Sequence, residues 1–356
     1  MTEALRPLRG SARLIALASA LSASVALSPL AGIASADTTH RLEAADNVEA
    51  ALAWSQFTFA DGSAPTALLA RDDLFADSLS SGSAQGRLNA PLLLTASSAL
   101  DPRAAAELTR LGTRTVHILG GEDAVSATVQ TTLETAGFTV NRVSGPTRIE
   151  TAIAVANTVF PVTTQVVVAR AYAGNDPTQA FADSLVTGAF TASTNMPVLF
   201  TESGRLTETT REYLTGSAVE FVNVAGGTEA VSAGVVAEIE AILEAKDAEG
   251  GVTRLAGPNR FATAVRMNVG ASFSSAGDGD RVLLIEGQSD DAWASGFSAA
   301  VQAAGEGAPL VLANGDNLPP ETAEFLDDAD GRIALVCGPF TTDGACDAAS
   351  DVVGNE

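Results

Sequence analysis

The chain states one pattern three times, at a spacing of about a hundred residues. The motif FADSL at Phe75–Leu79 is followed by APLLLT at Ala90–Thr95. The pair returns as FADSL at Phe181–Leu185 with MPVLFT at Met196–Thr201, and in altered form as WASGF at Trp293–Phe297 with APLVLA at Ala308–Ala313. Such tandem similarity indicates three copies of one small domain. The copies account for most of the 356 residues, so little chain remains for a separate catalytic domain.

Within each copy, short apolar runs alternate with stretches of helical periodicity. In the second copy we expect strands at 165–169, 197–201, 221–225 and 252–255, with helices between them. The wholly apolar, β-branched run at 165–169 is typical of a buried parallel strand. The alternation predicts an α/β fold, in which each copy is a small parallel sheet with helices on both faces, layered like a flavodoxin or Rossmann domain.

The periodicity divides the chain into five segments. We assign residues 1–36 to a leader, 37–143 to repeat 1, 144–255 to repeat 2, 256–340 to repeat 3 and 341–356 to an acidic tail. Repeat 3 is expected to stop short, without its last helix and strand. Residues 38–42 align with the last strands of the other repeats, at 139–143 and 253–255. We therefore predict that this N-terminal strand fills the gap in repeat 3 and closes a ring of repeats.

The first 36 residues have the features of an export signal. Arg6, Arg9 and Arg13 form a basic start, an apolar stretch runs over 14–27, and Ala34–Ala36 (ASA) is a small-residue cleavage site. The alternative is a helix that stays in the membrane, but the apolar stretch is shorter than the ~20 residues that a span needs. We expect a mature, secreted protein without a membrane anchor, located in the cell wall or outside the cell.

Two cysteines, Cys337 and Cys346, lie nine positions apart. In an exported chain this spacing favours a disulfide that closes a small loop. The alternative is a pair of free thiols, with Cys337 buried in a strand. A zinc site is disfavoured because no histidine lies near them.

The charge balance excludes two classes of partner. The chain has 20 Lys and Arg residues against 43 Asp and Glu, a net charge of −23. Nucleic acids and anionic membrane surfaces both require a cationic face, so we expect neither as a partner.

Signatures of common enzyme classes are missing from the sequence. The two histidines, His40 and His117, form no metal-binding pair, and no Gly-x-Ser-x-Gly, Gly-x-Gly-x-x-Gly or Gly-Lys-Ser/Thr motif occurs in the expected context. We expect no cofactor and no catalytic residue. A pair of carboxylates that hydrolyses a glycan stays open as an alternative, because acidic residues are abundant.

Several longer motifs resemble a known family. RVSGPTRIETA at Arg142–Ala152 and RLAGPNRFATA at Arg254–Ala264 are similar to the heads of the type 2 cell-wall-binding repeat, as are the FADSL and PLLLT motifs and the Gly-Gly turns at Gly120 and Gly226. The resemblance implies a Gram-positive surface or secreted protein whose three modules pack as a compact pseudo-threefold unit. It also implies non-covalent binding to a secondary polymer of the wall, often an anionic one. We expect a monomer of three modules.

Parallel α/β sheets bind ligands beyond the carboxyl ends of their strands, near helix N-termini. Three kinds of candidate residue fall there. The Gly-Gly turns offer backbone N–H groups, the family resemblance assigns anion-binding arginines, and two aspartates open the FADSL helices: Gly120, Gly121, Gly226, Gly227, Arg148, Arg260, Asp77 and Asp183. The alternatives are structural, with the aspartates capping helices or pairing with arginines and the glycines forming tight turns.

Two substitutions weaken this pattern. Asn47 stands where the head of repeat 1 should have its arginine, and Ser295 replaces the aspartate of repeat 3. Repeat 2 alone has both residues, so we expect one fully competent module.

The acidic composition makes simple charge attraction to an anionic polymer impossible. Binding then needs a local arginine cluster, a bridging cation or a neutral glycan. Two acidic runs could contribute to a calcium site, but neither has the spacing of a calcium loop, so we expect no metal. They are Asp278, Asp280, Asp290 and Asp291, and Asp327, Asp328 and Asp330.

The expected function is non-enzymatic, non-covalent binding to a cell-wall polymer. One alternative is a secreted, carboxylate-dependent hydrolase of wall glycans. The other is a soluble secreted protein that binds a small molecule or a protein and has lost affinity for the wall.

Overall fold

The computed structural model describes residues 38–172, 179–305, 307–327, 329 and 333–354. The predicted leader at 1–36 and the acidic residues Asp328 and Asp330 lie outside these ranges. Within them, no helix is long and apolar enough to cross a membrane.

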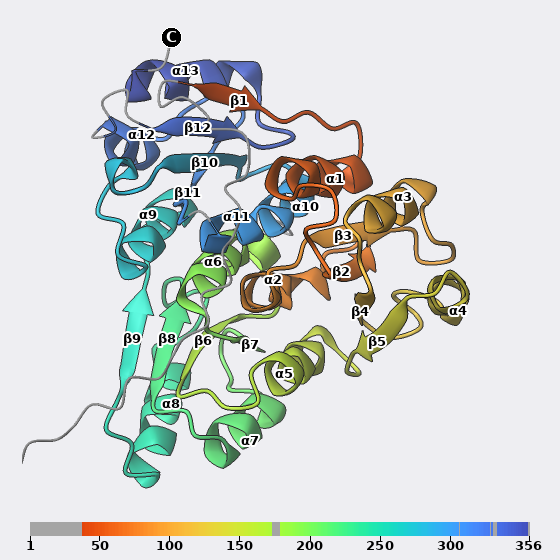
Figure 1. Ribbon diagram of the computed structural model, residues 1–356. Helices are drawn as coiled ribbons and strands as arrows, with labels where there is room; N and C mark the ends of the chain where they lie inside the picture. The colour runs from red at the N-terminus through yellow and green to blue at the C-terminus, as the bar shows by residue number, and fades with distance from the viewer. Residues whose placement is uncertain (1–37, 173–178, 306, 328, 330–332, 355–356) are drawn as a thin grey trace, which may run out of the picture. The chain divides into compact units, whose positions relative to one another are not determined.

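Repeat 1 forms a four-stranded parallel sheet in the order β3-β2-β4-β5 (Figure 1). Its elements, in chain order, are α1 (Asn47–Thr58), β2 (Thr66–Arg71), η1 (Ser78–Ser80), α2 (Ser81–Leu88), β3 (Leu92–Thr95), α3 (Pro102–Arg110), β4 (Thr115–Leu119), α4 (Ala127–Thr135) and β5 (Thr139–Val143). Three of its helices begin at a side chain that accepts a backbone N–H bond, which satisfies otherwise unpaired donors: Asp46, Asp101 and Ser126.

Repeat 2 forms an equivalent parallel sheet in the order β7-β6-β8-β9. Its elements are α5 (Arg148–Val159), β6 (Gln165–Arg170), α6 (Gln179–Thr194), β7 (Val198–Thr201), α7 (Glu208–Gly216), β8 (Phe221–Ala225), α8 (Ala233–Ala245) and β9 (Val252–Leu255). A capping box starts α5, in which Thr147 and Glu150 bond each other's backbone N–H groups.

Repeat 3 forms the third parallel sheet, in the order β1-β12-β10-β11. Its elements are α9 (Arg260–Gly270), η2 (Ala276–Asp278), β10 (Arg281–Glu286), α10 (Ala292–Ser298), α11 (Ala300–Gly305), β11 (Leu310–Ala313), α12 (Pro320–Asp327), β12 (Ala334–Cys337) and α13 (Asp343–Val353). The fourth strand, β1 (Thr39–Arg41), comes from the N-terminal part of the chain and pairs parallel with β12, Thr39 opposite Leu335. The predicted completion of this sheet by residues 38–42 is therefore confirmed.

The expectation that repeat 3 lacks its last helix is wrong. Most of the predicted acidic tail forms α13, which Thr342 caps by accepting a bond from the Ala345 N–H. The sequence does not predict this helix, because Gly344 and three aspartates within it have low helix propensity. Four small or apolar residues at helical spacing nevertheless bury one face completely: Ala345, Cys346, Ala349 and Val353.

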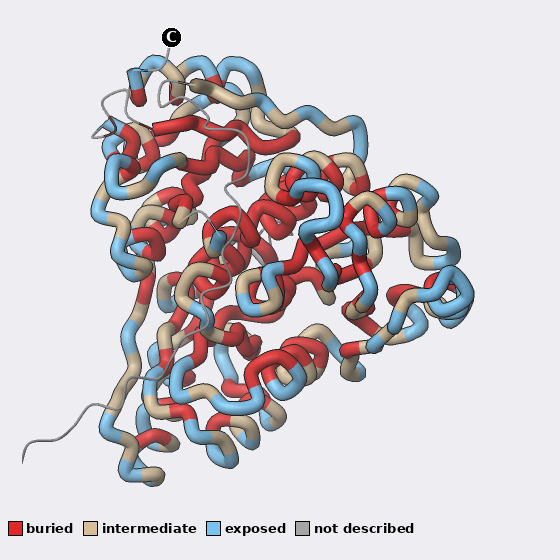
Figure 2. Tube along the Cα trace, viewed as in Figure 1, coloured by how far each residue is buried: buried red, intermediate tan, exposed pale blue. Residues whose placement is uncertain are grey.

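Strand β6 shows how each sheet is covered on two faces. Val166 and Val168 pack in a cluster with residues of α7 and α8. Val167 and Ala169, which alternate with them, belong to the central cluster that includes Leu185 of α6. Figure 2 shows the resulting pattern, in which the sheets and the helices between them are buried and the outer helices are exposed on one side. The prediction of three parallel-sheet α/β modules is confirmed.

Helices α2, α6 and α11, one from each repeat, pack against one another (Figure 1). The aromatic residues that open the three FADSL-type motifs converge beside them. The ring centroids of Phe75 and Phe181 are 5.3 Å apart, and those of Phe75 and Trp293 are 6.3 Å apart. Equivalent positions of the repeats thus meet at one place, as a pseudo-threefold arrangement requires.

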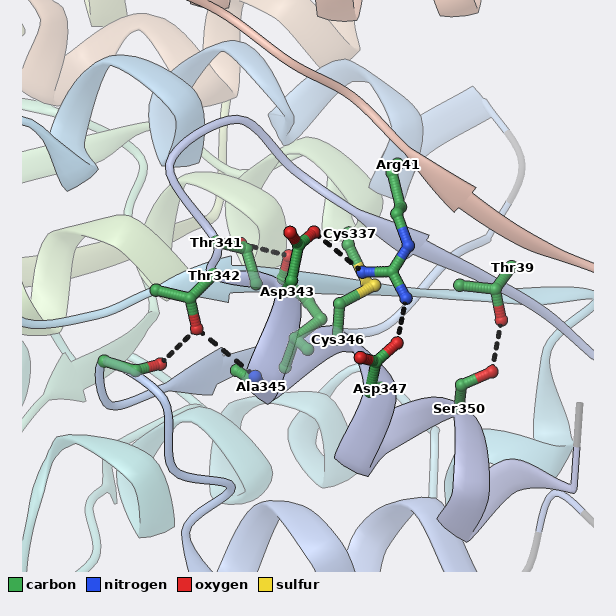
Figure 3. Close-up of a disulfide and its surroundings, with 12 residues drawn as sticks. Thr39, Arg41, Cys337, Thr341, Thr342, Asp343, Ala345, Cys346, Asp347 and Ser350 are labelled. Atoms are coloured by element: carbon green, nitrogen blue, oxygen red, sulfur yellow. Dashed lines mark hydrogen bonds and ion pairs between the residues drawn. A yellow bond between two sulfur atoms is a disulfide. The ribbon is translucent and has the colours of Figure 1, made fainter.

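The expected disulfide joins Cys337 of β12 to Cys346 of α13, with a Cα–Cα distance of 6.0 Å (Figure 3). Strand β1 is tied to the same helix. Arg41 forms an ion pair with Asp347 at 2.5 Å, and the Thr39 hydroxyl lies 2.7 Å from that of Ser350. Segments from opposite parts of the chain are therefore fastened together around β12.

Candidate functional site

Two pockets occupy equivalent places at the carboxyl ends of the strands of repeats 1 and 2. The first has a volume of about 440 Å³ and is lined by residues that include Arg71, Asp77, Gly121 and Arg148. The second has a volume of about 460 Å³, and the corresponding residues are Arg170, Asp183, Gly227 and Arg260. The structure thus brings the sequence-predicted candidates together in two groups.

The Gly-Gly turns stand directly against the aspartates. A β-carbon on Gly120 would lie 2.5 Å from Asp77 Oδ2, and one on Gly226 would lie 2.6 Å from Asp183 Oδ2. Both glycines also have positive φ angles, +100° and +84°. Only glycine meets both conditions, so each turn is shaped to let a carboxylate approach the backbone.

Each pocket takes its head arginine from the next repeat. Gly145 lies two residues after β5, and β5 lies beside β4, which Gly120 follows. The head of repeat 2 therefore places Arg148 in the pocket of repeat 1. In the same way, Arg260 from the head of repeat 3 enters the pocket of repeat 2.

This pairing across repeats corrects the expectation of one competent module. Asp77 shares a pocket with Arg148, and Asp183 shares one with Arg260. By the same rule, the head of repeat 1 belongs to the pocket of repeat 3. Asn47, which replaces the head arginine, and Ser295, which replaces the aspartate, therefore belong to the same pocket. Two pockets are complete, and the third has lost both residues.

The equivalent place in repeat 3 is altered at further positions. Glu286 ends β10 where Arg71 and Arg170 end β2 and β6. Its carboxylate accepts bonds from the backbone N–H groups of Gln288, Ser289 and Gly315. The indole of Trp54 donates to the Ser295 hydroxyl at 3.1 Å, and both side chains are buried. Glu286, with its carboxylate bound to the backbone, thus replaces the strand-end arginine in repeat 3.

The sequence missed Arg71 and Arg170, which sit at the last residue of a buried strand. Arg170 is 3.6 Å from Asp183, whereas Arg71 makes a two-point contact with the neighbouring Asp73 at 2.5 and 2.7 Å. The signal that identifies them is their repetition, since each follows an apolar run by one position.

Of the two structural alternatives for the aspartates, helix capping does not hold as stated, whereas pairing with an arginine is observed for Asp183. Asp77 precedes η1, but its side chain makes no capping bond, and Asp183 lies inside α6 rather than at its start. Asp183 forms an ion pair with Arg170, an arginine that the sequence did not single out.

Burial dominates the electrostatics of both pockets. It raises the pKa of Asp183, and Arg170 and Arg260 oppose that rise. It lowers the pKa of Arg148, whose guanidinium lies 5.3 Å from the ring centre of Phe75 and 5.0 Å from that of Tyr172. Arg148 and Arg260 are also fixed by hydrogen bonds to the carbonyls of Ala171 and Gly287.

The pockets are not positively charged overall. Arg71 and Arg148 face Asp77, Glu122 and Asp123 in the first, and Arg170 and Arg260 face Asp183 and Glu229 in the second. The two histidines lie elsewhere, His40 in β1 and His117 in β4. Among the residues that the structure describes, no three His, Cys, Asp or Glu side chains are grouped to hold a metal ion.

Comparison with known proteins gives one family match. Residues 41–130 and 142–236, together more than half of the chain, match the profile of "Cell wall binding domain 2 (CWB2)". These ranges cover most of repeats 1 and 2, whereas Arg260 of the second pocket lies beyond them.

A curated relative and two solved structures are also similar. The N-acetylmuramoyl-L-alanine amidase LytC of Bacillus subtilis (strain 168) is 26% identical over 255 residues, which are 72% of this chain and 46% of that protein. Cwp8 from Clostridium difficile superposes with a TM-score of 0.75 at 24% identity, over 90% of this chain and 52% of its own. Cwp6 from the same organism gives 0.76 at 19% identity, over 89% and 48%. The chain thus spans about half the length of these relatives, and the two structures share its fold.

Proposed function

Because the chain belongs to the cell wall binding domain 2 family, we propose that it attaches non-covalently to a polymer of the bacterial cell wall and catalyses no reaction. We further propose that the polymer binds at the two strand-end pockets, in repeats 1 and 2. The observation that carries this proposal is the arginine that each pocket receives from the following repeat. It assembles the site from two modules, so binding and module packing depend on each other.

The pocket chemistry favours directional hydrogen bonding over bulk charge attraction. Arginine and carboxylate charges nearly balance in each pocket. A guanidinium held in a fixed orientation donates in a plane and matches hydroxyl, carboxylate or phosphate oxygens. A wall glycan offers such oxygens along its length, and two pockets on one chain can engage the same polymer and gain avidity.

Co-sedimentation with purified cell walls tests the proposal. We expect the exported chain to pellet with walls and to be released by denaturant. Arg148→Gln and Arg260→Gln are each expected to weaken binding, and the double variant is expected to remain in the supernatant. Lysine at either position should not restore binding, because it keeps the charge but loses the planar donor group.

Arg114→Gln is the matched control. Arg114 is exposed and immediately precedes β4, at the opposite end of the sheet from the pocket, and its loss removes the same charge. Full binding by the double Arg148/Arg260 variant, with its thermal transition intact, would place the polymer elsewhere. Failure of the unmodified chain to pellet, with or without calcium, would favour a soluble binding protein.

The same preparation separates binding from hydrolysis. We expect no clearing in a gel that contains wall material and no release of soluble fragments from the walls. Clearing that persists after purification would instead assign the chain to the wall hydrolases.

A further inference from the structure

Repeat 2 has a second cavity, at the opposite ends of its strands. It has a volume of about 360 Å³ and lies between the end of α5 and the end of α7. Its walls include Val162, just before β6, and Tyr213, Gly216 and Ser217, before β8. Because the strands are parallel, this groove lies at their amino ends, whereas the strand-end pockets lie at their carboxyl ends.

In repeat 1 the same place is filled by an ionic cluster. Arg110 donates to the Phe59 carbonyl at 2.8 Å, to Asp61 at 2.9 Å and to Glu107 at 2.7 Å. Ser55 completes the cluster by donating to Glu107. These side chains hold the end of α1 against the end of α3.

Repeat 2 has lost every member of that cluster. Counting from the helix starts, Ala156 replaces Ser55, Val162 replaces Asp61, Tyr213 replaces Glu107 and Gly216 replaces Arg110. A β-carbon on Gly216 would meet nothing within 4 Å, so the space of the arginine is open. In repeat 3 the residue that corresponds to Tyr213 is Phe325, which is buried in the module's own core.

The groove keeps its shape because the segment between α7 and β8, which forms one of its walls, is held by hydrogen bonds. Lys246, the only lysine of the chain, donates from Nζ to the carbonyls of Leu214, Ser217 and Val219 at 2.8, 2.8 and 2.9 Å. The wall between α7 and β8 is thereby fixed. Within the described part of the chain, the buried Ser217 hydroxyl has no hydrogen-bond partner, so a donor or acceptor is left for a ligand.

The lining chemistry identifies the ligand class. Val162 is 83% exposed, and with Pro161 and the half-buried ring of Tyr213 it forms an apolar wall. Asn157 and Glu212 supply an amide and a carboxylate at the rim. A sugar ring has an apolar C–H face and a rim of hydroxyl groups, which matches this division.

The charge of the groove excludes an anionic ligand. Glu212 is the one charged residue of the lining, and no arginine or lysine faces it there. A carboxylate accepts bonds from sugar hydroxyls but repels a phosphate or a uronic acid. We propose that this groove of repeat 2 binds one uncharged sugar residue, independently of the strand-end pockets.

Saturation-transfer NMR on the full exported chain tests this proposal, with methyl glucoside as the uncharged probe and glucuronic acid as its charged counterpart. We expect signal transfer to methyl glucoside that variants disrupting the groove remove, whereas any transfer to glucuronic acid, through the strand-end pockets, should be left unchanged by them. Tyr213→Phe keeps the ring and should bind within about twofold of the parent, whereas Tyr213→Ala should bind about tenfold more weakly.

A second variant, which fills the groove, keeps the test valid if Tyr213→Ala does not fold. Val162→Asp with Gly216→Arg transplants the ion pair of repeat 1 into the groove, and we expect it to abolish transfer to methyl glucoside while the thermal transition is kept. Arg114→Gln, which lies outside the groove and outside the strand-end pockets, should leave transfer unchanged. Undiminished transfer to methyl glucoside in the filling variant, loss of transfer to glucuronic acid in that variant, or no transfer to methyl glucoside from the parent chain would each overturn the proposal.

Discussion

At the scale of single residues, Asp183 is a buried side chain whose environment opposes its ionised form. Burial raises its pKa although two arginines lie close by. A carboxyl whose pKa is higher in the folded than in the unfolded protein binds more protons when folded, between those two values. Its ionisation therefore reduces stability as pH rises through that window, and the loss persists at neutral pH. A buried carboxyl with a perturbed pKa in a pocket is a candidate for a functional role.

Asp183→Asn tests this interpretation. At pH 7 we expect the variant to melt about 2–4 °C above the parent, because the desolvation penalty of the carboxylate is removed. The difference should shrink as the pH is lowered and the parent's carboxyl takes up its proton. Scanning calorimetry from pH 7 downward measures both effects. A parent that is more stable than the variant across the whole range would show that the Arg170 contact outweighs burial.

The candidate residues of the site were predictable from sequence, but their grouping was not. Asp77, Asp183, Arg148, Arg260 and the Gly-Gly turns repeat visibly, and the structure places them in pockets. The sequence assigns each arginine to its own repeat, and only the strand order shows that a head follows the edge strand of the previous sheet. Arg71 and Arg170 were not predicted as site residues, because a charged residue after an apolar run commonly marks only the end of a strand.

At the scale of elements, β1 is a three-residue strand whose partner lies near the other end of the sequence. It protects backbone groups of β12, because the Leu335 N–H bonds the Thr38 carbonyl and the Leu42 N–H bonds the Cys337 carbonyl. Removal of residues 38–42 leaves both groups without these partners. It also exposes a row of unpaired strand backbone, which is a template for aggregation.

Deletion of residues 38–42 should therefore loosen one sheet only. We expect amide hydrogen exchange to accelerate in β10, β12 and α13, with β6 and β8 unchanged. Arg41→Ala is the control, because it removes an exposed ion pair worth about 0–1 kcal/mol and leaves the strand backbone in place. Equal acceleration in all three sheets would mean that the repeats unfold as one unit.

Most strands were predictable to within one or two residues, because each is a short apolar run between polar turns. Two elements were not. The FADSL segment of repeat 1 begins as η1 at Ser78 instead of as a helix at Phe75. Helix α13 is composed of residues with weak helix propensity, and its buried face, not its local sequence preference, stabilises it.

At the scale of the molecule, the three repeats depend on close contact of their inner helices. A β-carbon on Gly82 of α2 would lie 2.4 Å from the Cα of Gly188 in α6, which is backbone and cannot rotate away. A β-carbon on Gly188 would instead meet Ala300 of α11 at 3.8 Å, an ordinary contact. Close approach of the helices thus requires glycine on one side only.

Gly82→Ala is expected to force α2 and α6 apart and to lower the free energy of unfolding by about 1–3 kcal/mol. It should also weaken wall binding, because the first pocket combines residues of repeats 1 and 2. Gly188→Ala adds the same methyl group and should be nearly neutral. Chemical denaturation of the two variants provides the comparison, and equal destabilisation would show that packing between the repeats is not the cause.

The pairing of Thr39 with Leu335 sets an order of events for a chain that emerges from its N-terminus. Strand β1 has no complementary edge until almost all of the remaining chain has followed, and loop closure over this distance is slow. Repeats 1 and 2 have all their strands long before that moment. The sheets that carry the two strand-end pockets therefore have all their strands before the sheet of repeat 3 is complete.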